Sequence, residues 1–347
     1  MKFDVEKYKK YYFDTVTELL LTPSPSGYYI EIMKVVERYA KDLGADFALT
    51  NKGCAILSVK GKDESKTVGL SAHCDTLGAM VRGISKNGEL SFTRVGGPQL
   101  PTLDGEFCTV ITRGGKKYTG TFLSKSPSSH VYPDAATKPR DEANMYVRLD
   151  EIVKSDEDVR NLGIESGDYV CIDPKTTVTT SGFLKSRFID DKASVACFIT
   201  LLKIMKDENL VPASNVKMLI TMYEEVGHGA AYVPDGLDCM LAVDMGCVGS
   251  DLNCTEFDVS ICAKDSHGPY DYPLTSKLIE LAKQNGLNYA VDIYPFYGSD
   301  VGAMWTAGYD VPGALIGTGV HASHGMERTH FEGIKNTISL ISLYLGL

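Results

Sequence analysis

The sequence predicts an α/β protein that carries a small all-β insert, and three observations lead to this prediction. Short, almost entirely apolar segments alternate with amphipathic helical segments, which is the pattern of a sheet covered by helices on both faces. Between residues 78 and 181 the pattern changes to short alternating segments separated by turn dipeptides such as Asn87-Gly88. The chain has 347 residues, a length at which two domains are more usual than one.

The first part of the chain is expected to contain two helices and two strands. Apolar residues recur at helical spacing over residues 4–21, and the Pro-containing segment 22–27 ends that helix. A second helix follows and stops at Gly44, a residue that often ends helices. The apolar segments 54–59 and 67–73 predict two strands.

The segment 78–181 is expected to form the all-β part. Its candidate strands cover residues 89–93, 107–112, 117–123, 145–149 and 169–172. A short helix fits residues 156–162, because Ser155 and Asp158 have the spacing of a helix-capping pair. Residues 124–143 are polar and contain several prolines, which predicts a long loop.

After Asp190 the alternation of helices and strands resumes. The expected helices cover 192–206, 274–284, 300–307 and 331–345, and the expected strands cover 215–221, 240–244, 257–262 and 313–317. We therefore expect an α/β domain made of residues 1–77 and 182–347, interrupted by an inserted β-domain at 78–181. Open α/β sheets bind ligands beyond the carboxyl ends of their strands, so polar residues at those ends are candidates for a site.

The composition disfavours several partners and compartments. The formal net charge is −10 at pH 7, and no basic run occurs, which argues against nucleic acid and anionic membranes as partners. No segment is long and apolar enough to span a bilayer, and the N-terminus lacks an apolar signal core. The nine cysteines are irregularly spaced without a CxxC pair, which indicates reduced thiols in a cytoplasmic protein.

Two side chains at the end of the 67–73 strand are expected to point into one site. His73 and Asp75 are two residues apart, so they share a face of an extended chain. The imidazole is expected to bind a metal ion, with the carboxylate orienting or polarising it. A capped strand end is the ordinary alternative for such a pair.

Two pairs of adjacent acids add four carboxylates to the candidates. Asp190 and Asp191 precede a predicted helix; we expect one to cap it and the other to bridge two cations, and the residues alone do not decide which. Glu224 and Glu225 follow a buried strand, so one is expected to bind metal and the other to act as a general base. Acids gathered in this way need cations among them, which predicts a two-metal hydrolase.

Two later positions extend this set. Asp244 closes an apolar strand, where an uncompensated carboxylate is unfavourable, so a ligand or hydrogen-bonding role is expected. Residues 321–330 contain three of the seven histidines, and we expect at least one of them, such as His324, to complete a second metal site.

The chain resembles the di-metal aminopeptidases of family 42, which include tetrahedral, glutamyl and deblocking aminopeptidases. The resemblance runs nearly from end to end and follows the order of the family's motifs. The segments that carry it are TPSPSGYY, SAHCDTLGAMV, NLGIESGDYVCID, FIDDKAS, MYEEVGHGAA, YGSDVGAMWTAGYDVPGALIG and SHGMERTH.

The resemblance implies a role for each candidate residue. The implied metal ligands are His73 and Asp244 on one ion, Glu225 and His324 on the other, and Asp190 bridging both. Glu224 is then the general acid and base. Asp75 orients or polarises His73 and is not itself a metal ligand. The family also implies two divalent ions per subunit, with zinc or cobalt the expected metals.

The family implies a fold and an assembly as well. Its fold is an α/β metallopeptidase domain with a mixed central sheet flanked by helices, interrupted by a small barrel-like β-domain. Its members form homo-oligomers, commonly dodecamers. Three positions depart from its motifs, with Thr76 in place of Glu, Lys192 in place of Arg and Gly325 in place of Ser. His321 stays an alternative to His324.

The expected function is therefore metal-dependent release of N-terminal amino acids from peptide substrates. A hydroxide that bridges the metals is expected to attack the peptide carbonyl, with Glu224 as general base. The alternatives are a non-peptide amide hydrolase or deacylase on the same metals, a metal-independent glucanase, and a non-catalytic metal-binding assembly protein. Glu224 beside Glu225 argues against the last of these.

Overall fold

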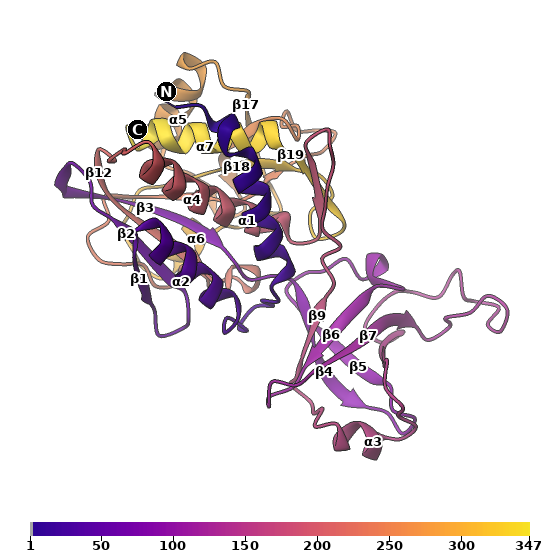
Figure 1. Ribbon diagram of the computed structural model, residues 1–347. Coiled ribbons are helices and arrows are strands. Elements are labelled where there is room, and N and C mark those ends of the chain that lie inside the picture. Colours follow the sequence, from indigo (N-terminus) through magenta and orange to yellow (C-terminus); the bar gives the residue numbers. More distant parts are fainter. Residues whose placement is uncertain (1–2) are drawn as a thin grey trace. The chain divides into compact units, whose positions relative to one another are not determined.

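The computed structural model describes residues 3–347, which divide into two compact units. One unit is Thr76–Pro174, and the other is Lys175–Leu347 with the described part of Met1–Asp75. The predicted fold class is confirmed, since a mixed sheet flanked by helices accompanies a closed antiparallel barrel (Figure 1). The domain boundaries at 78 and 181 stay a prediction. Within the described residues, no helix has the length and apolar character needed to cross a membrane.

The larger unit is built on a mixed sheet of ten strands among the described residues. Its order is β1-β2-β12-β3-β13-β18-β15-β16, with β14 beside β18 and β17 beside β15. The strands are β1 (Asp46–Leu49), β2 (Ala55–Val59), β3 (Asp63–His73), β12 (Ser214–Thr221), β13 (Cys239–Val243), β14 (Gly246–Cys247), β15 (Val259–Asp265), β16 (Gly268–Pro269), β17 (Tyr289–Ile293) and β18 (Gly313–Val320).

Four parallel neighbours at the centre of this sheet define its functional edge. β12 and β13 both run parallel to β3, and β13 also runs parallel to β18. Their carboxyl ends therefore lie at the same edge, where His73 pairs in register with Thr221. The last five residues of β3 and all of β18 are buried, as expected for strands covered on both faces.

Helices cover this sheet around one almost entirely buried helix, α4 (Ile189–Asp207). Helices α1 (Lys9–Leu21), α2 (Ile32–Leu43) and α7 (Phe331–Tyr344) all contact α4 (Figure 1). A helix that is apolar around most of its circumference must be central, and α4 meets that requirement. The remaining helical elements are η1 (Val5–Tyr8), η3 (Glu224–Val226), α5 (Tyr272–Gln284) and α6 (Asp300–Thr306).

The smaller unit is a closed barrel with the strand order β4-β5-β8-β7-β6-β9. Its strands are β4 (Gly78–Ile84), β5 (Leu90–Val95), β6 (Phe107–Ile111), β7 (Lys117–Ser124), β8 (Met145–Leu149) and β9 (Tyr169–Ile172), and its helical elements are η2 (Leu100–Leu103) and α3 (Asp156–Asn161). Phe92 and Phe122 fill its interior edge to face, with ring centroids 5.1 Å apart. Ser155 caps α3 through the Asp158 amide, as the sequence predicts.

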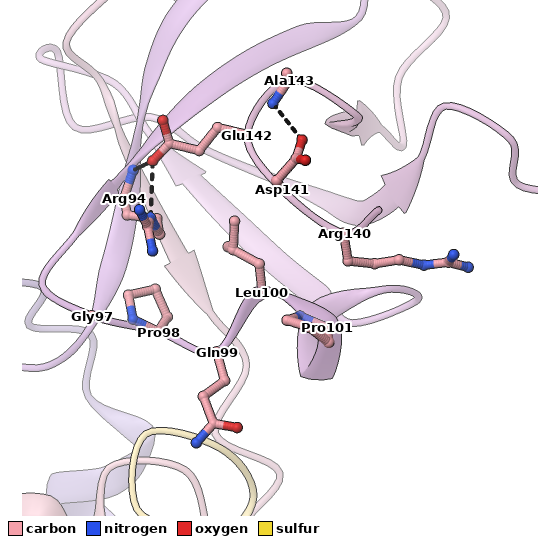
Figure 2. A pocket seen from close by; sticks show the side chains of 10 residues that line it. All are labelled: Arg94, Gly97, Pro98, Gln99, Leu100, Pro101, Arg140, Asp141, Glu142 and Ala143. Atoms are coloured by element: carbon pink, nitrogen blue, oxygen red, sulfur yellow. Dashed lines mark hydrogen bonds and ion pairs between the residues drawn. The ribbon is translucent and has the colours of Figure 1, made fainter. Parts of the chain in front are cut away.

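A shallow hollow of about 680 Å³ lies on the barrel unit, between the segments 97–101 and 140–143 (Figure 2). Its charged side chains have partners within the unit. Arg94 donates to Glu142 through both its backbone amide and its Nε, and Arg140 pairs with Asp104. None of the predicted site residues lines this hollow.

Several elements differ from the sequence-based expectations. The first helix is divided into η1 and α1, and the helix expected from residue 192 begins at Ile189, with non-helical backbone at Asp190 and Asp191. Glu224 and Glu225 form a 3₁₀ turn, because β12 already ends at Thr221. The structure also contains strands that were not expected, which are β1, β4, β14, β16, β17 and a small sheet of β10 (Thr177–Val178), β11 (Phe183–Ser186) and β19 (Glu327–His330).

We predict that Gly317→Ala in β18 destabilises the protein by about 1–3 kcal/mol, because a Cβ atom there would overlap the Asp244 carbonyl group. Urea unfolding measures the change. Gly249→Ala is the control, since its nearest neighbour, Asp251 Oδ1, lies 3.6 Å from the added carbon. Equal stability of the two variants would contradict this packing constraint.

Candidate active site

His73 lies at the centre of the candidate site and is only 1% exposed. Its Nε2 atom lies 3.0 Å from Asp190 Oδ1 and 3.7 Å from Glu224 Oε2. On the other side of the ring, Nδ1 lies 3.0 Å from the Asp75 carbonyl oxygen and 3.6 Å from its carboxylate Oδ1. One buried imidazole therefore contacts acidic residues through both of its nitrogens.

Asp75 connects His73 to the pair of glutamates. The backbone amides of Glu224 and Glu225 donate to its two carboxylate oxygens, over 3.2 and 3.4 Å. The Ser26 hydroxyl also donates to Asp75, and Ser24 donates to the neighbouring carbonyl of Cys74. Segment 22–27, which the sequence marks as the end of a helix, thus also fixes the backbone and carboxylate beside His73.

His324 lies with the acids, whereas His321 is exposed. His324 Nε2 lies 3.5 Å from Glu225 Oε2 and 3.6 Å from Asp190 Oδ2. The backbone of His321 is paired with Arg328 in a β-bridge. Asp190 therefore has one carboxylate oxygen facing His73 and the other facing His324.

Two groups of side chains have the composition and spacing of a metal site. His73, Asp191 and Asp244 form one group, and His73, Asp190 and Glu225 form the other, with potential ligand atoms within 4.8 Å of one another. Asp191 Oδ1 and Glu225 Oε1 are buried and accept no hydrogen bond from the residues that the structure describes. Imidazole nitrogen with carboxylate oxygen is a donor set that suits zinc and related divalent ions. The residues therefore fit a divalent cation.

The pKa values of the site's carboxyl groups reflect its excess of negative charge. Burial, reinforced by the Asp190 carboxylate, raises the pKa of Asp244 to about 7. Burial also raises the pKa values of Glu224, Glu225 and Asp191 well above the usual range of a carboxyl group. Burial opposes ionisation of Asp190, but the hydrogen bonds from His73 and Ser323 and the charges of His73 and His324 together lower its pKa.

The family model described as M42 glutamyl aminopeptidase matches residues 53–340 of this chain. The chain belongs to this family. It is therefore a peptidase hydrolase of the aminopeptidase type. The protein named "Putative aminopeptidase YhfE" from Bacillus subtilis (strain 168) is 40% identical over 333 residues, which cover 96% of each chain.

Solved structures of two peptidases share the fold of this M42 protein. The TET aminopeptidase from the marine sediment archaeon Thaumarchaeota archaeon SCGC AB-539-E09 has a TM-score of 0.86 at 22% identity, over 96% of both chains. The Pyrococcus horikoshii TET1 peptidase, which can assemble into a tetrahedron or a large octahedral shell, has a TM-score of 0.84 at 22% identity, over 96% of this chain and 99% of the other.

The three departures from the M42 motifs fall outside the contacts between predicted ligands. Lys192 is buried and donates to the carbonyl oxygens of Leu19 and Thr22, where α1 ends. The Gly325 carbonyl accepts a hydrogen bond from Arg187. Thr76 is buried, with 3% exposure. Lys192 therefore stabilises the carboxyl end of a helix, where a cation is favourable.

Two buried acids with clear structural contacts were not among the candidates from sequence. Glu327 accepts hydrogen bonds from the backbone amides of Asp190 and His324. Asp300 accepts hydrogen bonds from the Thr221 hydroxyl and the Ala230 amide, at the two ends of the segment that carries Glu224 and Glu225. Asp300 closes the Gly-Ser-Asp tripeptide 298–300, and Glu327 lies three residues after His324, but neither position shows its distant partners in the sequence.

We predict that Asp300→Asn removes part of the pH dependence of stability in the metal-free protein. Burial raises the pKa of Asp300 to about 6, so the folded protein keeps this proton at pH values where the unfolded chain releases it. The stability that this group contributes is therefore full below pH 4 and lost as the pH rises to about 6. The shift corresponds to about 3 kcal/mol.

Urea unfolding with a chelator present measures this effect. The stability of the Asp300→Asn variant relative to the unsubstituted protein should increase by about 3 kcal/mol between pH 4 and pH 7. Asp14→Asn is the control for loss of one carboxylate, because the Asp14 side chain is 62% exposed. A constant difference across this pH range would show that Asp300 is not responsible.

Proposed function

We propose that this M42 protein is a di-metal aminopeptidase that releases N-terminal amino acids from peptides. The observation that carries the proposal is the grouping of imidazoles and carboxylates beyond the ends of parallel strands β3, β12, β13 and β18, together with the start of α4. This edge of the sheet is where α/β proteins of this kind bind their ligands.

We assign His73 and Asp244 to one ion and Glu225 and His324 to the other, with Asp190 shared between them. The two oxygens of Asp190 face His73 and His324 separately, which supports the bridging role for this residue. Asp191 instead accepts a hydrogen bond from the His73 amide and interacts with the Ser194 side chain. That pattern is closer to the helix-capping role expected for one of the two aspartates.

The bound cations, zinc or cobalt in this proposal, would polarise the scissile carbonyl and make a water molecule more acidic. Glu224 takes the proton from the attacking water and returns it to the leaving amine. Glu224 lies beside His73, with Oε2 3.7 Å from Nε2, which places a carboxylate at the site to accept that proton. Asp75 keeps the imidazole of His73 oriented and holds the backbone of Glu224 beside it.

The proposal extends to assembly and location. A homo-oligomer, with a dodecamer as the specific form, is supported by the shell-forming TET1 peptidase that shares this fold. A cytoplasmic location is supported by nine cysteines that are all free thiols in the structure.

We predict that Glu224→Gln lowers kcat for an aminoacyl p-nitroanilide by at least about 100-fold, since the amide cannot accept the proton. Metal content, measured by mass spectrometry, should stay near that of the unsubstituted protein, because Glu224 is not an assigned ligand. Glu280→Gln on the exposed face of α5 is the matched control. Full turnover by the Glu224→Gln variant would overturn the assigned role of Glu224.

Removal of divalent ions provides a test of the metal requirement. A chelator should abolish turnover, and zinc or cobalt should restore it at two ions per chain. The ions should also raise the melting temperature, because ligands that bind only the folded state stabilise it. Full activity of the metal-free protein would contradict the di-metal assignment and leave only the family membership.

A further inference from the structure

Glu327, the first residue of β19, joins two segments that carry predicted metal ligands. Its carboxylate is buried, with 1% exposure. Oε2 accepts a hydrogen bond of 3.1 Å from the Asp190 amide, and Oε1 accepts one of 3.0 Å from the His324 amide. One side chain therefore connects residues that lie more than a hundred positions apart in the sequence.

The electrostatic surroundings make an acid at this position unfavourable unless it has a specific role. Burial raises the pKa of Glu327 well above its usual range, and the charge of Asp190 raises it further. Glu327 in turn contributes to the raised pKa of Glu225. Hydrogen bonds from the backbone of Asp190, His324 and Ile189 favour the charged form and offset part of this cost.

The strand that contains Glu327 does not depend on its side chain. Glu327 pairs with Ser186 in the ladder between β11 and β19, and this pairing uses the backbone alone. The loop between β18 and β19 has a strained backbone. Ala322 and His324 have φ angles of 60° and 65°, which are unfavourable for residues other than glycine. The bond from the His324 amide to Glu327 holds this loop in that conformation.

We propose that Glu327 is a positioning residue that sets the separation of Asp190 and His324 before any ion binds. This inference rests on the proposed function, because it takes those two residues to be metal ligands. Both carboxylate oxygens face N–H donors, so only a side chain with two acceptors at this reach satisfies both. Partners that orient metal ligands in this way typically change metal affinity by about 10- to 100-fold.

Two substitutions separate positioning from simple attraction of cations. Glu327→Gln keeps the length but offers one acceptor and one donor, so one backbone amide loses its partner. Glu327→Asp keeps the charge but is one methylene shorter and does not reach both amides. Positioning predicts that both variants bind zinc about 10- to 100-fold more weakly. Attraction by charge alone predicts that Glu327→Asp binds zinc as tightly as the unsubstituted protein.

The measurement is a zinc titration of the metal-free protein in competition with a chromophoric chelator. Glu332→Gln, in the first turn of α7, is the control for loss of a negative charge near β19, since its side chain pairs with Lys335. The metal-free variants should remain folded at the temperature of the titration, and excess zinc should restore most of kcat without a change in KM. A purely structural role would lower the melting temperature and leave the zinc affinity of the folded protein unchanged.

The possible outcomes distinguish this inference from the proposed function. If the unsubstituted protein binds neither zinc nor cobalt, the proposed function is wrong. If it binds zinc and either Glu327 variant binds equally well, the inference alone is wrong. Failure of both variants to fold would assign Glu327 to the stability of β19 and would also overturn the inference.

Discussion

The crowding of carboxylates around one buried imidazole is the constraint on which the rest of this structure depends. His73 contacts Asp75, Asp190 and Glu224 directly, and Asp244 and Glu225 lie close enough to alter its charge balance and that of its neighbours. Buried charges of one sign are strongly unfavourable in a low-dielectric interior. Two histidines, His73 and His324, cannot neutralise all of these acids, so the fold supplies favourable interactions from elsewhere.

Backbone amides provide much of this compensation. Asp75 accepts the amides of Glu224 and Glu225, Glu327 accepts those of Asp190 and His324, and Asp300 accepts that of Ala230. Hydrogen bonds to an ionised group are stronger than those between neutral groups. These donors belong to the same segments that carry the predicted ligands. Each supporting acid is therefore stabilised by the backbone that it positions. The same hydrogen bonds offset the cost of burying the acid and hold the predicted ligands in place.

The sequence predicts those parts of the site that depend on local patterns. His73 and Asp244 are visible because a polar residue follows an apolar strand, and the order of elements follows from the alternation of helices and strands. Glu327 and Asp300 are not visible in this way, because Asp190, Thr221 and Ala230, which donate to them, come from segments far away in the chain. The short polar strands β11 and β19 likewise lack a hydrophobic pattern, since they pair through their backbones at the margin of the larger unit.

The choice between Asp190 and Asp191 illustrates the same limit. Both are buried acids in one dipeptide, and local chemistry allows either to bridge two cations or to cap α4. The difference arises from their surroundings. Asp190 faces His324, which lies in the loop between β18 and β19, whereas Asp191 accepts a hydrogen bond from the His73 amide. The resemblance to the family favours Asp190 on motif position, and the contacts give a physical reason for that preference.

The position of these residues in the chain ties the site to the folding of the whole larger unit. Its predicted ligands run from the end of β3 to the loop after β18, so no short segment contains a site, and the parallel strands must be paired before the acids meet. In the metal-free protein their mutual repulsion opposes that pairing. Cations would replace this repulsion by attraction and would bind only the folded arrangement, which stabilises it by mass action. Function and stability then depend on the same ions, and the hydrophobic burial of α4 and the central strands must hold the acids together until the ions bind.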